Sequence, residues 1–139
     1  MDIRQILEDT TNIAVIGLSK NELKDSYQVS MYMRNSGYNI IPINPTTDSI
    51  MGVKSHNSLK DIPEDMIKNI ELINIFRKPE FVEDILEEVI EMKKKYGKIH
   101  TVWMQLGIFY DKADTVSKEN QLNIITNKCI KIEHGRLQN

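Results

Sequence analysis

The sequence has very little cysteine and no long apolar run. Cys129 is the only cysteine in the 139 residues, so the chain cannot form an internal disulfide. No apolar stretch reaches the length of a signal peptide or a membrane-spanning helix. Both features favour a soluble protein of a reducing compartment, and we expect it in the cytoplasm.

An excess of charge of one sign is also missing. The chain has 18 Lys and Arg residues against 20 Asp and Glu residues, a formal net charge of −2, and the two signs are interspersed. Bulk charge therefore predicts neither nucleic acid nor a membrane as a partner. The three histidines, His56, His100 and His134, lack metal-ligand spacing, so we expect no metal site and no catalytic residue among them. At this length we expect one domain over residues 1–139.

What the chain does have is a series of short apolar runs rich in Ile and Val. They lie at residues 13–16, 40–43, 72–76, 99–104 and 122–125. Such runs are typical of strands that are buried on both faces of a parallel sheet. Helical patterns between them predict right-handed βαβ crossovers. We therefore predict an α/β fold, a three-layer Rossmann-like domain with a mainly parallel five-stranded sheet.

The helical patterns differ in strength. The most regular apolar stripe covers residues 82–96, with Gly97 as its cap, and a second covers residues 29–36. Weaker patterns predict helices at residues 2–9 and 111–119. Residues 46–64 read as a long irregular connection with a short helix near Ser58, and loops of this kind often border ligands.

Gly17 ends the first apolar run, where an open parallel sheet binds its ligands. A glycine there lets the backbone approach a phosphate, although a plain tight-turn glycine would look the same. Ser19 and Glu22 occupy the second and third glycine positions of the dinucleotide fingerprint, and Asn44 stands where an NAD site has an acid. Both departures argue against NAD. There is also no P-loop motif.

Cations and hydroxyl groups gather near the predicted strand ends. Lys20, Lys24, Ser26 and Tyr27 follow the first strand, and Arg77 and Lys78 follow the third. Such groups can pair with several phosphates. The alternative for the two loop lysines is that they are ordinary solvated side chains.

Six stretches, in order along nearly the whole chain, carry a family resemblance. They are IAVIGLS (13–19), SYQVSMYMRNSGYNIIPINP (26–45), GVKSHNSLKDIP (52–63), INIFRKPE (73–80), VWMQLGI (102–108) and KCIKIEHGRL (128–137). In these stretches the chain resembles small single-domain CoA-binding proteins related to the CoA-binding domain of the succinyl-CoA synthetase α subunit. The resemblance implies that coenzyme A (CoA), or an acyl-CoA, is held across the strand ends.

The resemblance also implies which residues hold CoA. The loop of Gly17, Leu18 and Ser19 would contact the phosphates, and Ser26 and Tyr27 would open the helix beneath them. Four residues would flank the adenosine: Asn44, Pro45, Phe76 and Arg77. The predicted set is completed by Lys20, Lys24, Lys78, Gln105 and Gly107, although Gln105 could equally be a structural contact at a strand end.

A non-catalytic CoA-binding protein is the function that these residues favour. The alternative is an enzyme of the nucleotide-binding α/β class that acts on a CoA thioester or uses NAD(P). Succinyl-CoA synthetases carry their phosphorylated histidine in a second domain, so we do not expect the ligase reaction here. We expect Cys129 to be a small buried hydrophobe, the alternative being a reactive thiol at the mouth of the crevice. No protein partner can be identified from these residues.

Overall fold

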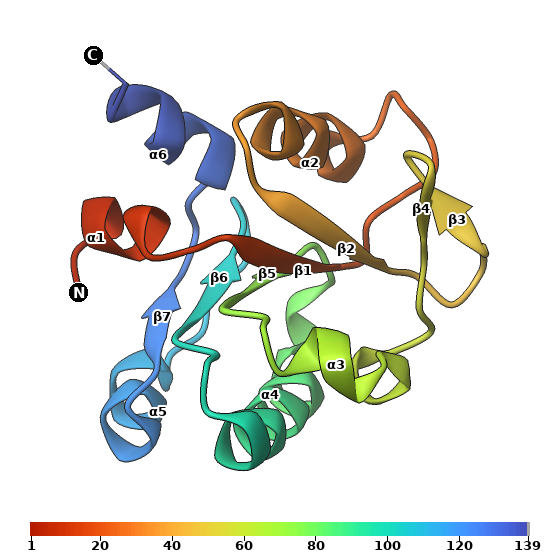
Figure 1. Ribbon diagram of the computed structural model, residues 1–139. Coiled ribbons are helices and arrows are strands. Elements are labelled where there is room, and N and C mark those ends of the chain that lie inside the picture. Colours follow the sequence, from red (N-terminus) through yellow and green to blue (C-terminus); the bar gives the residue numbers. More distant parts are fainter. Residues whose placement is uncertain (139) are drawn as a thin grey trace.

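The computed structural model describes residues 1–138 and shows a parallel sheet between two layers of helices (Figure 1). The α-helices are α1 (Ile3–Glu8), α2 (Asp25–Asn35), α3 (Glu64–Ile67), α4 (Val82–Tyr96), α5 (Ala113–Asn120) and α6 (Ile130–Arg136). The strands are β1 (Asn12–Ile16), β2 (Asn39–Ile43), β3 (Ser49–Ile50), β4 (Val53–Lys54), β5 (Leu72–Ile75), β6 (Thr101–Met104) and β7 (Asn123–Ile125). Two short 3-10 helices are η1 (Leu59–Asp61) and η2 (Pro79–Phe81).

The main sheet has the strand order β2-β1-β5-β6-β7, and each neighbouring pair is parallel. Ala14 of β1 pairs with Ile41 on one side and with Ile73 on the other. From β1 the chain builds outward to β2, then crosses back to build β5, β6 and β7 on the opposite side. The strand order therefore reverses between β1 and β5, which is where open α/β sheets bind ligands. The predicted five-stranded Rossmann-like fold is confirmed.

Side chains of β1 alternate between two cores, one on each face of the sheet. Ala14 and Ile16 pack in the core beneath α4, whereas Ile13 and Val15 pack in the core shared with α1, α2 and α6. All four side chains are buried. Burial on both faces explains why the strand sequences are continuous apolar runs rather than alternating ones.

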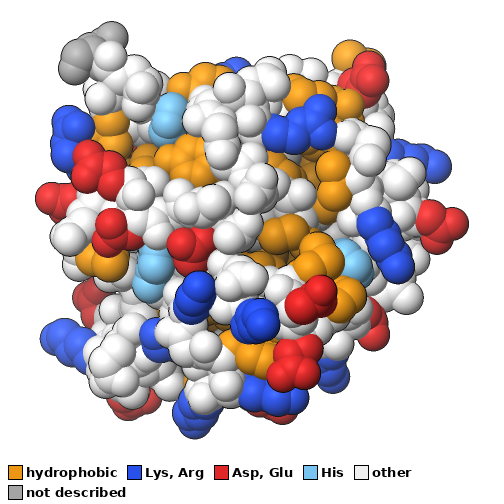
Figure 2. Space-filling view, viewed as in Figure 1, with side chains coloured by type: hydrophobic (Ala, Val, Ile, Leu, Met, Phe, Trp, Pro, Cys, Tyr) orange, Lys and Arg blue, Asp and Glu red, His pale blue; other side chains and the backbone are white. Residues whose placement is uncertain are grey.

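Charged side chains of both signs are scattered over the face seen in Figure 1, without a large field of one sign (Figure 2). Among residues 1–138, no helix combines the length and the apolar character that crossing a membrane requires.

The predicted helices over residues 29–36 and 82–96 are present as α2 and α4. Gly97 ends α4 in a left-handed conformation with φ of 85°, and its N–H donates to the carbonyl of Lys93 at 2.8 Å. Glycine adopts this conformation without strain, and for this reason the glycine after the apolar stripe predicted the end of the helix correctly.

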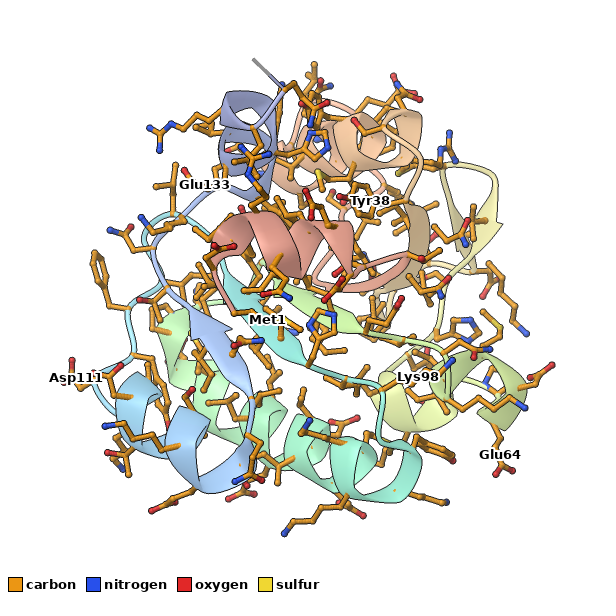
Figure 3. All side chains as sticks on the ribbon, turned by 60° about the vertical axis from the view of Figure 1, so that its left-hand side comes forward. Met1, Tyr38, Glu64, Lys98, Asp111 and Glu133 are labelled. Atoms are coloured by element: carbon orange, nitrogen blue, oxygen red, sulfur yellow. The ribbon has the colours of Figure 1, made fainter. Side chains whose placement is uncertain are left out.

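Two regions differ from the sequence prediction. The connection over residues 46–64 is not irregular throughout, because β3 and β4 form a small antiparallel hairpin before η1. The C-terminal helix α6 was not predicted at all. It is short and has no long apolar stripe, and tertiary contacts hold it: Ile130 is fully buried, and the hydroxyl of Tyr32 lies 2.9 Å from Nδ1 of His134. Helix α6 therefore packs against α2, and it also lies beside α1 (Figure 3).

Candidate functional site

Gly17 lies at the strand-order reversal, between the ends of β2 and β5. Its N–H donates to the carbonyl of Ile43 at 3.0 Å, and its φ of 86° is in the left-handed region. A Cβ atom at this position would overlap the carbonyl oxygen of Phe76. Gly17 is therefore required by its backbone conformation and by the close approach of β5, independently of any ligand.

The loop after β1 is fixed by polar contacts to its neighbours. The N–H of Ser19 donates to Oγ of Ser26 at 3.0 Å, and Nδ2 of Asn44 donates to the carbonyl of Leu18 at 2.9 Å. The Leu18 side chain is completely buried in the core beside α2. Leu18 can therefore meet a ligand only through its backbone, while Ser26 and Asn44 hold the loop in shape.

Helix α2 begins directly beneath this loop. The amides of Tyr27 and Gln28 both donate to the carbonyl of Lys24 at 3.1 Å. The preceding amides, those of Asp25 and Ser26, have no acceptor within residues 1–138. Amides of this kind and the helix dipole favour an anion. The side chains of Lys20 and Lys24 are exposed nearby, but the Asp25 carboxylate opposes them.

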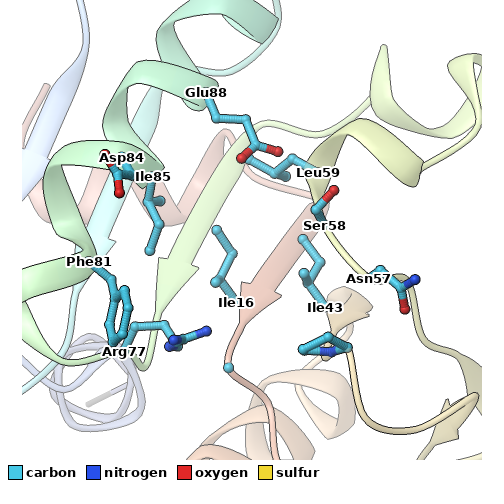
Figure 4. A pocket seen from close by; sticks show the side chains of 12 residues that line it. Ile16, Ile43, Asn57, Ser58, Leu59, Arg77, Phe81, Asp84, Ile85 and Glu88 are labelled. Atoms are coloured by element: carbon cyan, nitrogen blue, oxygen red, sulfur yellow. The ribbon is translucent and has the colours of Figure 1, made fainter.

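A cleft of about 180 Å³ opens on the α4 face of the sheet (Figure 4). We call it the α4 cleft; its lining consists of Ile16, Gly17, Ile43, Pro45, Asn57, Ser58, Leu59, Arg77, Phe81, Asp84, Ile85 and Glu88. The guanidinium of Arg77 stacks on the ring of Phe81, 4.2 Å from its centroid. It makes no ion pair or hydrogen bond with any described residue, so it remains available for an anion.

A second pocket, of about 350 Å³, opens on the opposite face of the sheet. We call it the α2–α6 pocket; it is lined by Asp25, Gln28, Val29, Phe76, Gln105, Leu106, Cys129, Lys131 and Ile132. Phe76 belongs to this pocket and its neighbour Arg77 to the α4 cleft. The two cavities therefore flank the end of β5, one on each face of the sheet.

Gln105 is held by contacts inside the protein. Its Nε2 donates to Oδ1 of Asn74, and its Oε1 accepts from the amide of Ile130 at 3.3 Å. The side chain is 4 % exposed. Both ends of the amide are thus used to join β5, β6 and the start of α6, which is the structural alternative that the sequence left open.

Gly107 and Lys78 line neither cavity. The N–H of Gly107 donates to Oδ1 of Asn127 at 2.9 Å, and its φ is 86°, so this glycine serves a turn. The structure therefore brings Gly17, Pro45 and Arg77 together in the α4 cleft and Phe76 and Gln105 together in the α2–α6 pocket. The other predicted residues line neither cavity; they are Leu18, Ser19, Lys20, Lys24, Ser26, Tyr27, Asn44, Lys78 and Gly107.

Several lining residues were missed from the sequence. Among them are Asn57, Ser58, Leu59, Phe81 and Ile85 in the α4 cleft, and Val29, Leu106 and Ile132 in the α2–α6 pocket. Most are apolar side chains at helical positions, which the sequence alone cannot distinguish from core residues. The hairpin and η1 bring residues 57–59 to the cleft. The sequence feature that could have indicated their role is their position in a long loop, because such loops often border ligands.

Cys129 is not buried as expected. It is half-buried and lines the α2–α6 pocket, where its neighbour in the chain, Ile130, begins α6. Trp103, in contrast, is completely buried, and its Nε1 donates to the carbonyl of Lys128 at 2.8 Å. The segment that carries Cys129 is therefore anchored to β6 immediately before the thiol.

No histidine lines either cavity, although His56 pairs with Ile43 and directly precedes Asn57, two residues of the α4 cleft. Burial lowers the pKa of His56, and the charge of Lys54 lowers it further, while Asp61 opposes the shift. Burial also lowers the pKa of His134. Within residues 1–138, no group of His, Cys, Asp and Glu side chains is arranged to hold a metal ion.

Comparison with known proteins adds an independent observation. A family model described as a CoA binding domain matches residues 11–135. The chain belongs to this CoA-binding family. The match covers both cavities and all of the strands, so the resemblance seen in the six sequence stretches is confirmed.

Two curated relatives support the assignment. The chain is 36 % identical to the uncharacterized protein YneT of Bacillus subtilis, with 96 % of this chain and 93 % of YneT covered. It is 30 % identical to an ADP-forming acetate–CoA ligase of Methanocaldococcus jannaschii over 87 % of this chain. That match spans only 17 % of the ligase, so most of the ligase lies outside the region that aligns with this chain.

Solved structures of similar size share the fold. A hypothetical protein from Pyrococcus horikoshii is 31 % identical and superposes with a TM-score of 0.85, over 99 % of this chain and 91 % of that one. A Thermus thermophilus protein is 28 % identical and superposes with a TM-score of 0.84, over 99 % of both chains. The fold of this chain is thus shared by small proteins of other organisms.

Proposed function

We propose that this protein is a cytoplasmic, non-catalytic CoA-binding protein that holds CoA or an acyl-CoA across the C-terminal ends of β1, β2 and β5. The observation that carries the proposal is the arrangement at the strand-order reversal. Two cavities on opposite faces of the sheet flank the end of β5, and Arg77 lies there with no anionic partner among the described residues.

The shape of CoA suits this arrangement, because CoA has an aromatic nucleotide at one end and a long flexible arm at the other. The α4 cleft has apolar walls from Ile16, Ile43 and Leu59, which favour the adenine ring. Arg77 and the first amides of α2 would neutralise the phosphates. The pantetheine arm would then pass Phe76 toward the α2–α6 pocket.

The lining residues favour binding over catalysis. No histidine lines either cavity, and Gln105 is already engaged inside the protein. A general acid–base pair requires two titratable groups within hydrogen-bond reach of the reacting atoms. The carboxylates of the α4 cleft, Asp84 and Glu88, lie at the end proposed for adenosine, far along the ligand from a thioester. In the α2–α6 pocket, Asp25 and Lys131 are exposed to solvent and form no ion pair with each other.

An NAD(P) enzyme is less well supported. An NAD site uses a carboxylate at the end of its second strand to accept from the ribose hydroxyls. The side-chain oxygen of Asn44 instead accepts from the amide and the hydroxyl of Thr46, at 2.8 and 2.7 Å. An enzyme acting on a CoA thioester remains the second candidate, because the Cys129 thiol lines the α2–α6 pocket.

Isothermal titration of the purified protein with CoA and with NAD tests the proposal. We expect a lower dissociation constant for CoA, because Asn44 cannot replace the ribose-binding acid and the loop lacks two fingerprint glycines. 3′-Dephospho-CoA is a useful third ligand, since it isolates the contribution of one phosphate. If NAD binds as tightly as CoA or more tightly, the proposal is wrong.

A further inference from the structure

The α2–α6 pocket has apolar side chains that remain exposed to solvent at its mouth. Leu106 is 61 % exposed and Ile132 is 47 % exposed. Both line the pocket, together with Val29 and Phe76. Large apolar side chains gathered around a concave surface indicate that an apolar group is bound there.

The polar groups of the pocket are unsuited to hold a polar ligand deep inside it. The Gln105 amide already has internal partners at both of its ends. Asp25, Gln28 and Lys131 are exposed to solvent. Apart from the Cys129 thiol, the remaining lining side chains are hydrocarbon, so the interior favours a methylene chain over a charged or hydrogen-bonding group.

Free CoA would cover less of this apolar surface than an acyl-CoA, because its arm ends in a small thiol. An acyl group attached to that thiol extends the arm at its far end. The end of β5 provides the route, since Phe76 lines the α2–α6 pocket and its neighbour Arg77 lines the α4 cleft. A ligand with its phosphates near Arg77 would therefore direct the thioester toward Leu106 and Ile132.

We propose that the physiological ligand is a CoA thioester with an apolar acyl chain, and that the α2–α6 pocket receives that chain. The inference rests on the proposed CoA-binding function and adds the class of acyl group. A charged acyl group such as a dicarboxylic one is disfavoured by the same reasoning. The one cation of the lining, Lys131, is exposed to solvent, so a carboxylate carried into the apolar interior would be desolvated away from it.

Calorimetric titration with CoA, acetyl-CoA, butanoyl-CoA, hexanoyl-CoA and succinyl-CoA tests the inference, with a reductant present to keep Cys129 as a thiol. Each methylene that leaves water contributes about a fourfold gain in affinity. We therefore expect the dissociation constant to fall stepwise from acetyl-CoA to hexanoyl-CoA. We expect succinyl-CoA to bind more weakly than butanoyl-CoA.

The substitutions Leu106→Ser and Ile132→Ser test the location. We expect each to bring the ratio of the CoA and hexanoyl-CoA dissociation constants closer to one. The matched control is Phe109→Ser, because Phe109 is 63 % exposed and lines neither cavity. The control should keep the wild-type ratio.

The outcomes separate the two proposals. If the wild type binds CoA but its affinity does not depend on acyl-chain length, or if succinyl-CoA binds best, the acyl-chain inference is wrong and the CoA-binding function stands. If the control lowers the ratio as much as the pocket variants do, the chain is bound elsewhere. If neither CoA nor any thioester binds, the proposed function itself fails.

Discussion

Replacement of Arg77 by alanine is the most direct test of the phosphate position. The guanidinium has no anionic partner among residues 1–138, so in the free protein it contributes mainly its stacking on Phe81. A cation–π contact at an exposed site is worth about 0.5–1 kcal/mol. A hydrogen bond to a charged group is worth about 1.5–3 kcal/mol. The substitution should therefore weaken ligand binding much more than it weakens the fold.

We expect Arg77→Ala to raise the dissociation constant for CoA roughly 12- to 160-fold, as measured by calorimetry. Arg77→Lys should give an intermediate value, because lysine keeps the charge but loses the planar fork. The matched control is Lys78→Ala, which removes the same charge from an exposed neighbour that lines neither cavity. Equal losses of CoA affinity for Arg77→Ala and Lys78→Ala would refute the reasoning. Such a result would show that only the overall positive charge matters, and not a direct contact between Arg77 and a phosphate.

Three further predictions follow from other parts of the structure. Gly17→Ala should lower the free energy of unfolding by about 2–4 kcal/mol in a urea titration, because it combines left-handed strain with overlap against Phe76. The matched control is Gly37→Ala, because Gly37 has a positive φ but open space around it. A loss of unfolding free energy as large as that of Gly17→Ala would show that backbone strain alone accounts for the effect. Incubation with CoA disulfide should give one mixed disulfide at Cys129, as the Cys129 thiolate displaces one CoA thiolate. Intact-mass measurement should show that the adduct forms faster on the folded protein than on the protein unfolded in urea. The adduct should be absent from Cys129→Ser. Burial lowers the pKa of His56 and His134, so the unfolded state binds more protons than the folded state near and below pH 6.5. The contribution of these histidines to the free energy of unfolding should be full above that pH and fall as the pH drops. His134→Gln should flatten the plot of unfolding free energy against pH.

The fold was predictable because its strands and longest helices carry strong local signals. The five Ile- and Val-rich runs correspond to β1, β2, β5, β6 and β7, and Gly97 marks the end of α4. The hairpin of β3 and β4 has only two residues in each strand, so no periodic pattern could reveal it. Helix α6 depends on contacts with Tyr32 that are distant in sequence.

The candidate site was predictable in its place but less so in its membership. The strand-order reversal follows from the fold class, and it brings Gly17 and Arg77 together as expected. What the sequence could not give is which polar side chains are already engaged. Whether an amide such as that of Gln105 is available to a ligand depends on partners 25 and 31 residues away, at Ile130 and Asn74.

That distinction divides the predicted residues into two groups with different consequences for binding. Ser26, Asn44 and Gln105 use their side chains to hold the loops and strand ends in place. Arg77 has no such partner among the described residues and can turn its full hydrogen-bonding capacity to a ligand. Because the first group fixes the loop before a ligand arrives, less conformational entropy is lost on binding. Substitutions in the first group should therefore reduce affinity together with stability, whereas Arg77→Ala should reduce affinity with little loss of stability.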